Sequence, residues 1–361
     1  MFIDHYVPHF DKDAGSRCVY QYICLFLQKG YLVKFIGDNF YQHEPYTTIL
    51  QQMGVEVLYG PWYLENIDTW LKENLQYIGY VFTNRPHISV KYMDKLREYG
   101  HPRIMYFGHD LHFLRLQREY EITHDEKQRI ESKKWKKIEL SVMRKADTVY
   151  YLSTVEKEVI NEIAPDVNVK NVIINNFSKF LDDINYNFKE RKGIIFVGGF
   201  AHDPNVDAML WFIKEVYPLI RKELEIPFYV VGSHAPDEIK ALEGNGVEIL
   251  GFVSDEDLRV LYNQCRIDVV PLRYGAGVKG KVIEALYNAI PLVTTSIGAE
   301  GIQDIESYVC IEDDAAKFAR AVIELYNDTE KLENMARRSQ EFIKKNYSTE
   351  AAWKLIEDDF S

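Results

Sequence analysis

The residues between Pro271 and Gly301 have the types and spacing of a site for phosphate and sugar groups. They read PLRYGAGVKGKVIEALYNAIPLVTTSIGAEG, in which a short apolar run leads into a glycine-rich loop with Lys279 and Lys281. Backbone N–H groups of such a loop, with the N-terminus of the helix that follows, can bind phosphate oxygens. Glu284 lies about one turn into that helix and can accept hydrogen bonds from sugar hydroxyls. The stretch therefore indicates a nucleotide-sugar site.

Strands and helices must position these groups, and the first half of the chain alternates the two. Residues 16–29 predict a helix with apolar positions on one face. Apolar runs predict strands at residues 2–5, 31–37, 55–58, 77–83, 103–107, 149–153 and 172–174. Strands that alternate with helices at this spacing favour a parallel, doubly wound sheet.

A polar, charge-rich stretch separates this half from a second alternation. Residues 178–192 read SKFLDDINYNFKERK and predict a linker. After it, helices are expected at residues 205–224, 255–264 and 281–289, and the tail from residue 314 is helical. Strands are expected at residues 193–197, 228–231, 247–250, 267–271, 292–295 and 308–311. The predicted fold class is α/β, with two Rossmann-like doubly wound parallel-sheet domains that face a cleft.

The composition sets limits on the class of protein. With 361 residues the chain is too long for one ordinary core, so two domains are expected. A net charge of −12 argues against a nucleic-acid partner. The four cysteines form no C-x-x-C pair, which favours a reduced, cytoplasmic setting over a disulfide framework or a zinc site. No signal peptide and no membrane-spanning apolar run is recognised.

Four ordered segments of the second half resemble the donor-binding domain of retaining GT-B glycosyltransferases, in particular glycosyltransferase family 4. They read FVGGFAHDPNVDA (196–208), LGFVSDEDLRVLYNQCRIDVVPL (250–272), GAGVKGKVIEAL (275–286) and PLVTTSIGAEGI (291–302). The first half resembles the family through VPHFDKDAGSR (7–17) and YFGHDLHFLR (106–115). The resemblance implies a GT-B fold whose parts are an N-terminal acceptor domain (1–177), the linker (178–192), a donor domain (193–340) and a C-terminal helix (341–361) that packs back on the first domain.

The resemblance assigns roles to residues of the glycine-rich loop. It implies that Glu284 hydrogen-bonds the ribose hydroxyls of the nucleotide, although the helix dipole alone also favours a glutamate near a helix start. The family's second glutamate, eight positions earlier, is replaced by Ala276. Contacts to the donor sugar are therefore expected from the backbone amides of Gly275, Gly277 and Val278.

Other residues of the second half are candidates for the diphosphate and the base. The leaving group gains negative charge as the glycosidic bond breaks, so cations should lie near it. The candidate cations are Lys279, Lys281 and Arg273, and the alternative for the lysines is a solvated loop. Gly199 ends the first strand and lets the backbone approach the ligand. Phe252 and Val253 follow the third strand, where the family holds the base through backbone groups.

The first half is expected to supply the groups nearest the reacting carbon. Gly15 and Arg17 open a helix whose N-terminus suits the departing phosphate, and the alternative for Arg17 is a surface position. His109, Asp110 and His112 follow the strand at residues 103–107, where family members have a histidine that faces the donor sugar. The sequence leaves open which of the three takes this part.

No metal site and no cofactor other than the donor are expected. The D-x-D pattern at residues 255–257 suits an acidic helix start, and neither it nor the one at residues 11–13 needs to be a metal site in a GT-B chain. Residues 133–137 read KKWKK within a helix that begins with a capping-box pattern. They form either a solvated face or a contact for an anionic membrane or a diphosphate-linked acceptor.

The function implied by the resemblance is retaining transfer of a sugar from a nucleotide-diphosphate sugar to a hydroxyl of a surface glycan or lipid-linked acceptor. UDP, GDP and dTDP donors are not distinguished. The expected location is cytoplasmic, either free or at the inner face of the cell membrane. Two alternatives stay open: a GT-B nucleotide-sugar epimerase, and a non-catalytic GT-B subunit that assists a partner transferase.

Overall fold

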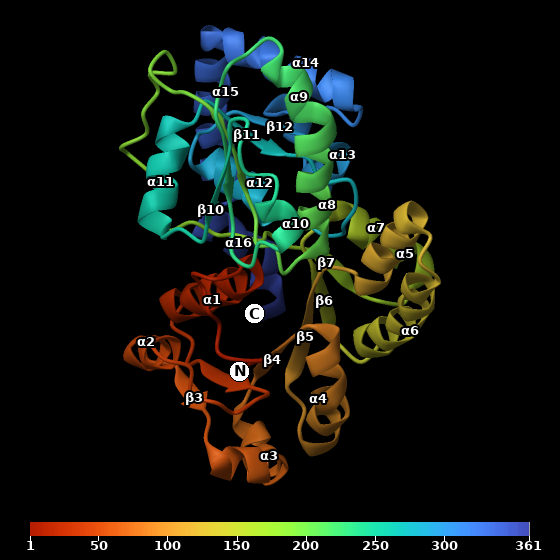
Figure 1. The fold of residues 1–361 in the computed structure, drawn as a ribbon. Coiled ribbons are helices and arrows are strands. Elements are labelled where there is room, and N and C mark those ends of the chain that lie inside the picture. Colours follow the sequence, from red (N-terminus) through yellow and green to blue (C-terminus); the bar gives the residue numbers. More distant parts are fainter. Residues whose placement is uncertain (361) are drawn as a thin grey trace. The chain divides into compact units, whose positions relative to one another are not determined.

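The chain folds into two units in a computed structural model that describes residues 1–360. Unit 1 contains Met1–Asn176 and Thr349–Ser361, and unit 2 contains Phe177–Ser348. Figure 1 follows the chain from the red N-terminal strands to the blue C-terminal helices. The chain therefore leaves unit 1 once and later returns to it.

Unit 1 is built on a parallel sheet that, within residues 1–360, has seven strands in the order β3-β2-β1-β4-β5-β6-β7. Its strands are β1 (Phe2–Asp4), β2 (Lys34–Gly37), β3 (Glu56–Leu58), β4 (Tyr80–Asn84), β5 (Arg103–His109), β6 (Thr148–Tyr151) and β7 (Val169–Asn171). The strand order reverses between β1 and β4. In doubly wound sheets, ligands bind outside the carboxyl ends of the strands at such a switch point.

Both faces of this sheet are apolar, because successive side chains of a strand point to opposite faces. Ile3, Val81 and Ile104 lie in one buried cluster with side chains from α3, α4 and α6. On the other face Phe2 stacks on Phe82 at a ring distance of 4.8 Å. The helical elements of unit 1 are α1 (Ala14–Gln28), α2 (Tyr46–Gln52), α3 (Pro61–Asn74), η1 (Leu75–Tyr77), α4 (Pro86–Tyr99), α5 (His112–Thr123), α6 (Glu126–Met143), α7 (Thr154–Ile163), α16 (Thr349–Ile356) and η4 (Glu357–Phe360).

Unit 2 repeats the same topology. Among the described residues its parallel sheet has six strands in the order β10-β9-β8-β11-β12-β13, which reverses between β8 and β11. The strands are β8 (Ile194–Val197), β9 (Phe228–Val231), β10 (Val247–Gly251), β11 (Ile267–Val270), β12 (Leu292–Thr294) and β13 (Cys310–Ile311). The expected fold class of two doubly wound parallel-sheet domains is confirmed.

The helices of unit 2 pack on this sheet through aromatic contacts, such as Phe212 against Phe228 and Phe318. The helical elements are α8 (Asp203–Trp211), η2 (Phe212–Val216), α9 (Tyr217–Arg221), α10 (Asp237–Lys240), α11 (Asp255–Gln264), α12 (Gly280–Tyr287), α13 (Ser296–Ala299), η3 (Ile305–Ser307), α14 (Ala315–Asn327) and α15 (Thr329–Asn346). The single helix predicted at residues 205–224 is interrupted by η2, a π-helical turn. Pro218 lacks an N–H group, so the helix changes its hydrogen-bond register just before it.

Two predicted segments take different places in the structure. The strand expected at residues 172–174 is wrong in position, because β7 occupies Val169–Asn171. The N–H of Val172 still donates to the carbonyl oxygen of Tyr151 at 2.9 Å, and the strand ends there. Residues 178–192, expected as a linker, belong to unit 2. There the buried Arg191 donates hydrogen bonds to the carbonyl oxygens of Asn185 and Tyr262, at 2.9 and 3.0 Å.

The C-terminal segment completes the core of unit 1. The buried carboxylate of Asp359 accepts hydrogen bonds from Tyr150 at 2.6 Å and from Arg103 and Lys170 at 2.7 Å. Phe360 packs on Phe82 with parallel rings. Strands β4, β5, β6 and β7 of the first sheet are thus held together by residues more than 180 positions later in the chain.

Candidate functional site

The switch point of unit 2 is built from the glycine turn after β8 and the side chains that support it. Asn205, in the first turn of α8, donates a hydrogen bond to the carbonyl oxygen of Gly199 at 2.6 Å. A Cβ atom on Gly198 would lie 2.3 Å from the amine of Lys281, and one on Gly232 would lie 2.0 Å from the carbonyl oxygen of Gly198. Glycine is therefore required at position 232, a side chain at position 198 would displace the Lys281 amine, and Gly199 keeps its backbone open at the end of the strand.

Lys281 points into unit 2 towards this turn. Its ammonium donates a hydrogen bond to Oδ1 of Asn205 at 2.6 Å and lies over the ring of Phe196 at 4.3 Å. Burial lowers the pKa of Lys281 to about 7, against the attraction of the Asp268 carboxyl group. Burial also raises the pKa of Asp268, which lies on β11. Lys281 thus joins α12 to the glycine turn, and its charge responds to pH near neutrality.

The glycine-rich loop between β11 and α12 has the open backbone that its sequence predicts. Gly275 and Gly277 adopt φ values of 147° and 72°, which L side chains rarely adopt. Lys279 donates hydrogen bonds to the carbonyl oxygens of Ala276, at 3.0 Å, and Gly277. Val278 is buried. The charge of Lys279 therefore lies at the loop and stabilises its shape.

The other donor-side candidates lie around the same edge of the sheet. Glu284 is half-buried in α12, one turn after its start. Arg273 forms an ion pair with Asp207 of α8, with Nε and Oδ2 at 2.9 Å, so a phosphate must compete with that carboxylate. Phe252, at the end of β10, is 56% exposed, and Val253 follows it. The carboxyl ends of β8, β10 and β11 therefore carry the predicted donor residues.

In unit 1, an irregularity in the strand pairing at the end of β5 determines the direction of the His109 side chain. The pairing of β5 with β6 shifts register between Phe107 and His109. A Cβ atom on Gly108 would lie 2.2 Å from the ring of Tyr151, so only glycine fits at this position. His109 has a φ of 67° and lies flat on Phe107, with ring centroids 4.4 Å apart. Non-glycine residues with positive φ are uncommon and occur often at functional sites.

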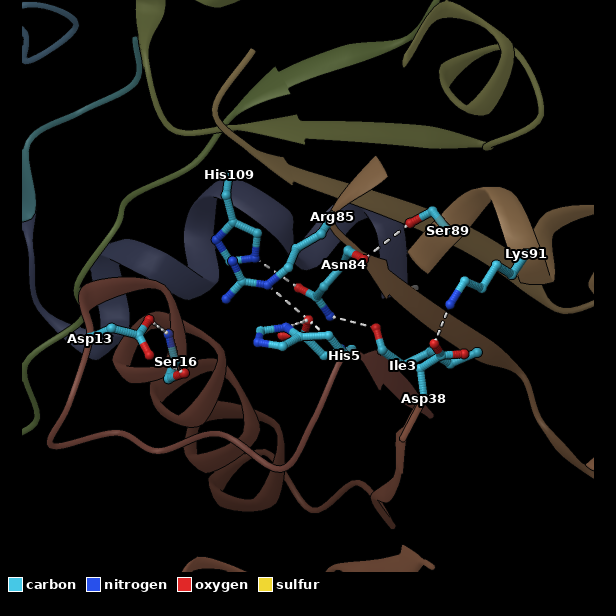
Figure 2. Close-up of polar contacts among 11 residues, drawn as sticks. Ile3, His5, Asp13, Ser16, Asp38, Asn84, Arg85, Ser89, Lys91 and His109 are labelled. Carbon is cyan, nitrogen blue, oxygen red and sulfur yellow. Dashed lines mark hydrogen bonds and ion pairs between the residues drawn. The ribbon is translucent and has the colours of Figure 1, made fainter. Parts of the chain in front are cut away.

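His109 and Arg85 lie side by side at the switch point of unit 1, as Figure 2 shows. His109 donates from Nε2 to Oδ1 of Asn84 at 3.2 Å. Arg85 follows β4 with a φ of 62° and donates from Nε to Oδ1 of Asp4 at 2.9 Å. Burial opposes ionisation of Asp4, but Arg85 and His5 outweigh it and hold the pKa of this carboxyl below its usual range. Burial, and then the Arg85 charge, lowers the pKa of His109 to about 3, which favours a neutral imidazole.

Asp110 and His112 belong to a second, connected group. His112 begins α5, and its Nδ1 lies 3.6 Å from Asp110 and 3.5 Å from the buried carboxylate of Glu139. Burial disfavours its charged form, but Asp110 and Glu139 outweigh burial and raise the pKa of His112. Asp110 also pairs with Arg115 at 3.1 Å. His109 is therefore the member of the predicted trio that lies beside Arg85, while Asp110 and His112 face α5 and α6.

The N-terminus of α1 is already capped by a side chain. Oδ1 of Asp13 accepts from the backbone N–H of Ser16 at 2.8 Å. Gly15 leaves room for Arg85, since a Cβ atom there would lie 2.9 Å from Nη2 of the guanidinium. Arg17 donates from Nε to the carbonyl oxygen of Phe10 at 3.0 Å and so braces the preceding loop. A phosphate at this helix start must share it with Asp13.

The sequence reasoning missed Asp4, Asn84, Arg85 and Asp268, and it interpreted Asn205 as a helix cap. Asp4 and Asn84 end β1 and β4, Arg85 follows β4, and Asp268 lies within β11. The strand order, which shows that β1 neighbours β4 and β8 neighbours β11, would have identified them. A polar residue at the carboxyl end of a predicted strand was the available signal, and it was used only for β5 and β8.

Within residues 1–360, no cluster of three or more His, Cys, Asp or Glu side chains has the arrangement of a metal site. Over the same residues, none of the helices combines the length and the apolar character needed to cross a bilayer.

Comparison with known proteins gives a family match for unit 2. Residues 191–328 match the family Glycosyl transferases group 1. An "uncharacterized 44.6 kDa protein in cps region" of Klebsiella pneumoniae is 27% identical over 172 residues, which are 45% of this chain and 44% of that protein. An uncharacterized glycosyltransferase of Methanocaldococcus jannaschii is 24% identical over 199 residues, which are 53% of this chain and 54% of that protein. The chain spans about half the length of the curated relatives it matches.

Solved structures match almost the whole chain. Sucrose-phosphate synthase of Thermosynechococcus elongatus superposes with a TM-score of 0.72 at 15% identity, over 99% of this chain and 97% of that one. HepE of Anabaena, in complex with UDP and glucose, superposes with a TM-score of 0.70 at 14% identity, over 99% and 98% of the two chains. The chain has the GT-B fold, and residues 191–328, within unit 2, match the glycosyl transferases group 1 family.

Proposed function

We propose that the protein is a retaining glycosyltransferase that moves a sugar from a nucleotide-diphosphate sugar to a hydroxyl group of a glycan. One observation carries the proposal. The family match at residues 191–328 covers the sheet whose carboxyl edge holds the glycine turn after β8, the loop at Gly275–Gly277 and Glu284. The complexes of HepE with UDP and with UDP-glucose support a nucleotide-sugar donor for this fold. The relative from a cps region supports a surface glycan as the product.

Unit 2 is the donor side in this proposal. Glu284 accepts hydrogen bonds from the ribose, and the open backbone at Gly275, Gly277 and Val278 approaches the sugar. Lys279 and the N-terminus of α12 oppose the charge of the diphosphate. Lys281 donates to Asn205, which in turn donates to the carbonyl oxygen of Gly199. These contacts support a positioning role for this lysine as well as an electrostatic one.

Unit 1 is the acceptor side. His109 is neutral at pH 7, and because its Nε2–H donates to Asn84, its Nδ1 can accept a hydrogen bond from a sugar hydroxyl without adding charge near the reacting carbon. The leaving phosphate accepts the proton of the acceptor hydroxyl on the same face, so the bond to the new oxygen forms as the bond to the phosphate breaks. No protein base, metal ion or further cofactor takes part in this proposed step.

A membrane contact is also proposed from the basic residues of α6. Lys133, Lys134 and Lys137 are exposed on this helix, close in sequence to the half-buried Trp135. Cations beside an aromatic ring suit an anionic lipid surface at the inner face of the cell membrane. Sedimentation with anionic and zwitterionic vesicles would test this contact, and equal binding to both would contradict it.

Nucleotide binding and donor hydrolysis test the function. A thermal-shift screen with UDP, GDP, dTDP and their sugars should find a stabilising nucleotide, because a ligand of the folded state raises its stability. Glu284→Ala should raise the Kd of that nucleotide about ten- to hundredfold, as expected for a lost hydrogen bond to a charged group. Glu330→Ala is the control, because Glu330 lies near the start of another helix of unit 2, α15.

The outcomes separate the candidate functions. Equal nucleotide affinity of Glu284→Ala and Glu330→Ala would contradict the placement of the ribose. Tight nucleotide binding without hydrolysis or transfer from any donor would favour a non-catalytic subunit. Conversion of one nucleotide sugar into another would favour an epimerase, and an absence of all nucleotide binding would contradict the proposed function.

A further inference from the structure

A continuous series of aromatic rings lies beside the switch point of unit 1. We call it the aromatic strip, and it consists of His5, Tyr6, His43 and Tyr41, with His9 against its middle. The ring centroids of His5 and Tyr6 are 3.5 Å apart, those of Tyr6 and His43 5.6 Å, and those of His43 and Tyr41 5.1 Å. His9 lies 4.8 Å from both Tyr6 and His43. The strip therefore joins the segment after β1 to the segment after β2.

The aromatic strip begins at the candidate reaction site. Nδ1 of His5 lies 2.8 Å from the same Asp4 oxygen that accepts from Arg85 at 2.9 Å. Figure 2 shows His5 below Arg85 and His109, at the carboxyl edge of the sheet. The strip then runs along this edge to Tyr41, two strands away from β4. A molecule that occupies the strip can therefore reach the groups around His109.

These rings all keep part of their surface accessible to solvent. His5, Tyr6, His9 and His43 are half-buried, and Tyr41 is 67% exposed. Folding gains little from an exposed ring, whereas a binding site gains from one. The strip is therefore better suited to contact a ligand than to stabilise unit 1.

Polar contacts hold the outer part of the strip in place. Nδ2 of Asn39 lies 2.8 Å from Nε2 of His43, and Nδ1 of His43 lies 3.1 Å from Nε2 of His9. Tyr46 stacks on His9 at 4.3 Å and donates to Asp11 at 2.6 Å. Burial lowers the pKa values of both His9 and His43, so both rings are neutral near pH 7. Two neutral imidazoles beside the Asp11 carboxylate do not suit an anionic lipid or a diphosphate.

We propose that the aromatic strip is the subsite for a neutral oligosaccharide acceptor, which binds over several sugar units with its non-reducing end towards His109. The proposal rests on the proposed function and names the acceptor class of that same site. Sugar rings present apolar C–H faces that pack on aromatic rings and hydroxyls that bond with imidazole and amide groups. Four rings in series exceed what one hexose can cover, so the subsite recognises a chain rather than a monosaccharide.

The test measures how affinity depends on chain length. The probes are unsubstituted neutral oligosaccharides of glucose, galactose and mannose, from monosaccharide to hexasaccharide, with binding followed by saturation-transfer NMR and calorimetry on the whole chain. For at least one series we expect the affinity of the wild-type protein to rise with length. Tyr41→Ala should weaken binding of the longer chains about three- to tenfold, the range expected for one ring contact, and Tyr41→Phe should keep the wild-type affinity.

Tyr77→Ala is the matched control. Tyr77 is 80% exposed in η1, before β4, and therefore lies at the amino edge of the same sheet. Binding of no oligosaccharide series, affinity independent of length, or equal losses in Tyr41→Ala and Tyr77→Ala would each overturn the proposal. Stronger binding of an anionic diphosphate-linked sugar than of the neutral chain would overturn it as well.

The same variants separate this proposal from the proposed function. Tyr41→Ala should leave nucleotide affinity at the wild-type value, because Tyr41 belongs to unit 1 and the proposed nucleotide-binding residues belong to unit 2. If the wild-type protein hydrolyses a sugar nucleotide but binds no oligosaccharide, only the acceptor subsite is refuted. If it binds oligosaccharides but no nucleotide, the proposed function is refuted.

Discussion

Two residues of unit 1 adopt backbone conformations that are unfavourable for their side chains. Arg85 and His109 have φ values of 62° and 67°, and they follow or end the adjacent strands β4 and β5. Such conformations persist when the surrounding contacts determine them, here the Asp4 pair for Arg85 and the close packing of Gly108 on Tyr151. Both side chains are thereby directed to one place, the edge of the sheet at its switch point.

The buried imidazole of His109 should make the stability of unit 1 sensitive to acid. Its pKa is lowered to about 3, by burial and then by Arg85, whereas an unfolded histidine titrates near 6.5. Between these values only the unfolded chain binds the proton, so the free energy of unfolding falls as the pH drops from about 6.5 towards 3. Urea unfolding at about pH 7 and pH 4 should show that the wild-type protein loses about 2–3 kcal/mol more than His109→Gln.

The neighbours of His109 define the control for this experiment. Asp4, Arg85, Asp110 and Asp13 act on its charge, and they are unchanged in His109→Gln. His101→Gln removes an exposed histidine of the same unit and should retain the wild-type pH dependence. The same loss of stability in His109→Gln as in the wild-type protein would show that other groups cause the acid sensitivity.

Individual site residues were predictable from the sequence only where a motif surrounds them. The glycine-rich loop, Glu284 and the histidine at the end of β5 have local patterns. The structure places the loop after β11, Glu284 one turn into α12, and His109 at the end of β5. The partners of these residues have no such pattern. Asn205 lies 76 positions from Lys281, and Arg85 lies 81 positions from Asp4, so only strand order brings them together. The ammonium of Lys281 also lies over the ring of Phe196 inside the unit. Phenylalanine is common in buried strands, so its presence in the sequence does not predict this contact.

At the scale of elements, helix and strand types were easier to predict than their limits. Apolar runs indicate burial, but they do not distinguish a hydrogen-bonded strand from the segment that follows it. For this reason the strand after β6 was predicted at residues 172–174 rather than at β7. The interruption of the helix at Phe212–Val216 arises from the backbone of Pro218, while the apolar pattern continues through it. The segment at residues 178–192 has the polarity of a linker, yet Arg191 and Phe188 anchor it in unit 2.

The C-terminal helix η4 should stabilise unit 1 through the carboxylate of Asp359. Asp359 is buried and accepts hydrogen bonds from Tyr150, Arg103 and Lys170. Asp359→Ala removes these bonds and leaves the tyrosine hydroxyl buried without this partner. We expect a loss of about 1–3 kcal/mol in the free energy of unfolding of unit 1, measured by urea denaturation.

Asp358→Ala is the matched control for this prediction, because Asp358 is the exposed neighbour in the same short helix. Its effect should stay within about 0.5 kcal/mol. A comparable loss in the two variants would mean that the helix, rather than the buried carboxylate, stabilises the strands.

At the scale of the whole molecule, two sheets with the same order of strands present two switch points. Their doubly wound character follows from the alternation of strands and helices and was predicted from the sequence. The assignment of the donor to unit 2 rests on motifs, and the structure adds that these motifs occupy the carboxyl edge of β8, β10 and β11. The proposed acceptor residues of unit 1 have weaker motifs, because aromatic side chains that share a surface need no fixed spacing along the chain.

Binding of a nucleotide should therefore slow hydrogen exchange more in unit 2 than in unit 1. With a nucleotide at about one hundred times its Kd, the folded state gains about 2.7 kcal/mol. Hydrogen exchange of the whole chain should slow most at the backbone amides of the Gly198–Gly199 turn and of residues 275–284, and least along β2 and β3 at the far edge of unit 1. The largest protection in unit 1 would contradict the assignment of the donor to unit 2.

The path of the chain has a consequence for synthesis. Domains generally fold in the order in which the ribosome makes them, with the N-terminal one first. Here residues 1–176 leave the ribosome first, but Asp359 and Phe360, which close the sheet of unit 1, are made only after all of unit 2. Unit 2 is continuous in sequence and can complete its core while unit 1 still lacks its final contacts. Phe82 can pack on Phe2 and Phe26 early in synthesis, but its contact with Phe360 forms only after the whole of unit 2 has been made.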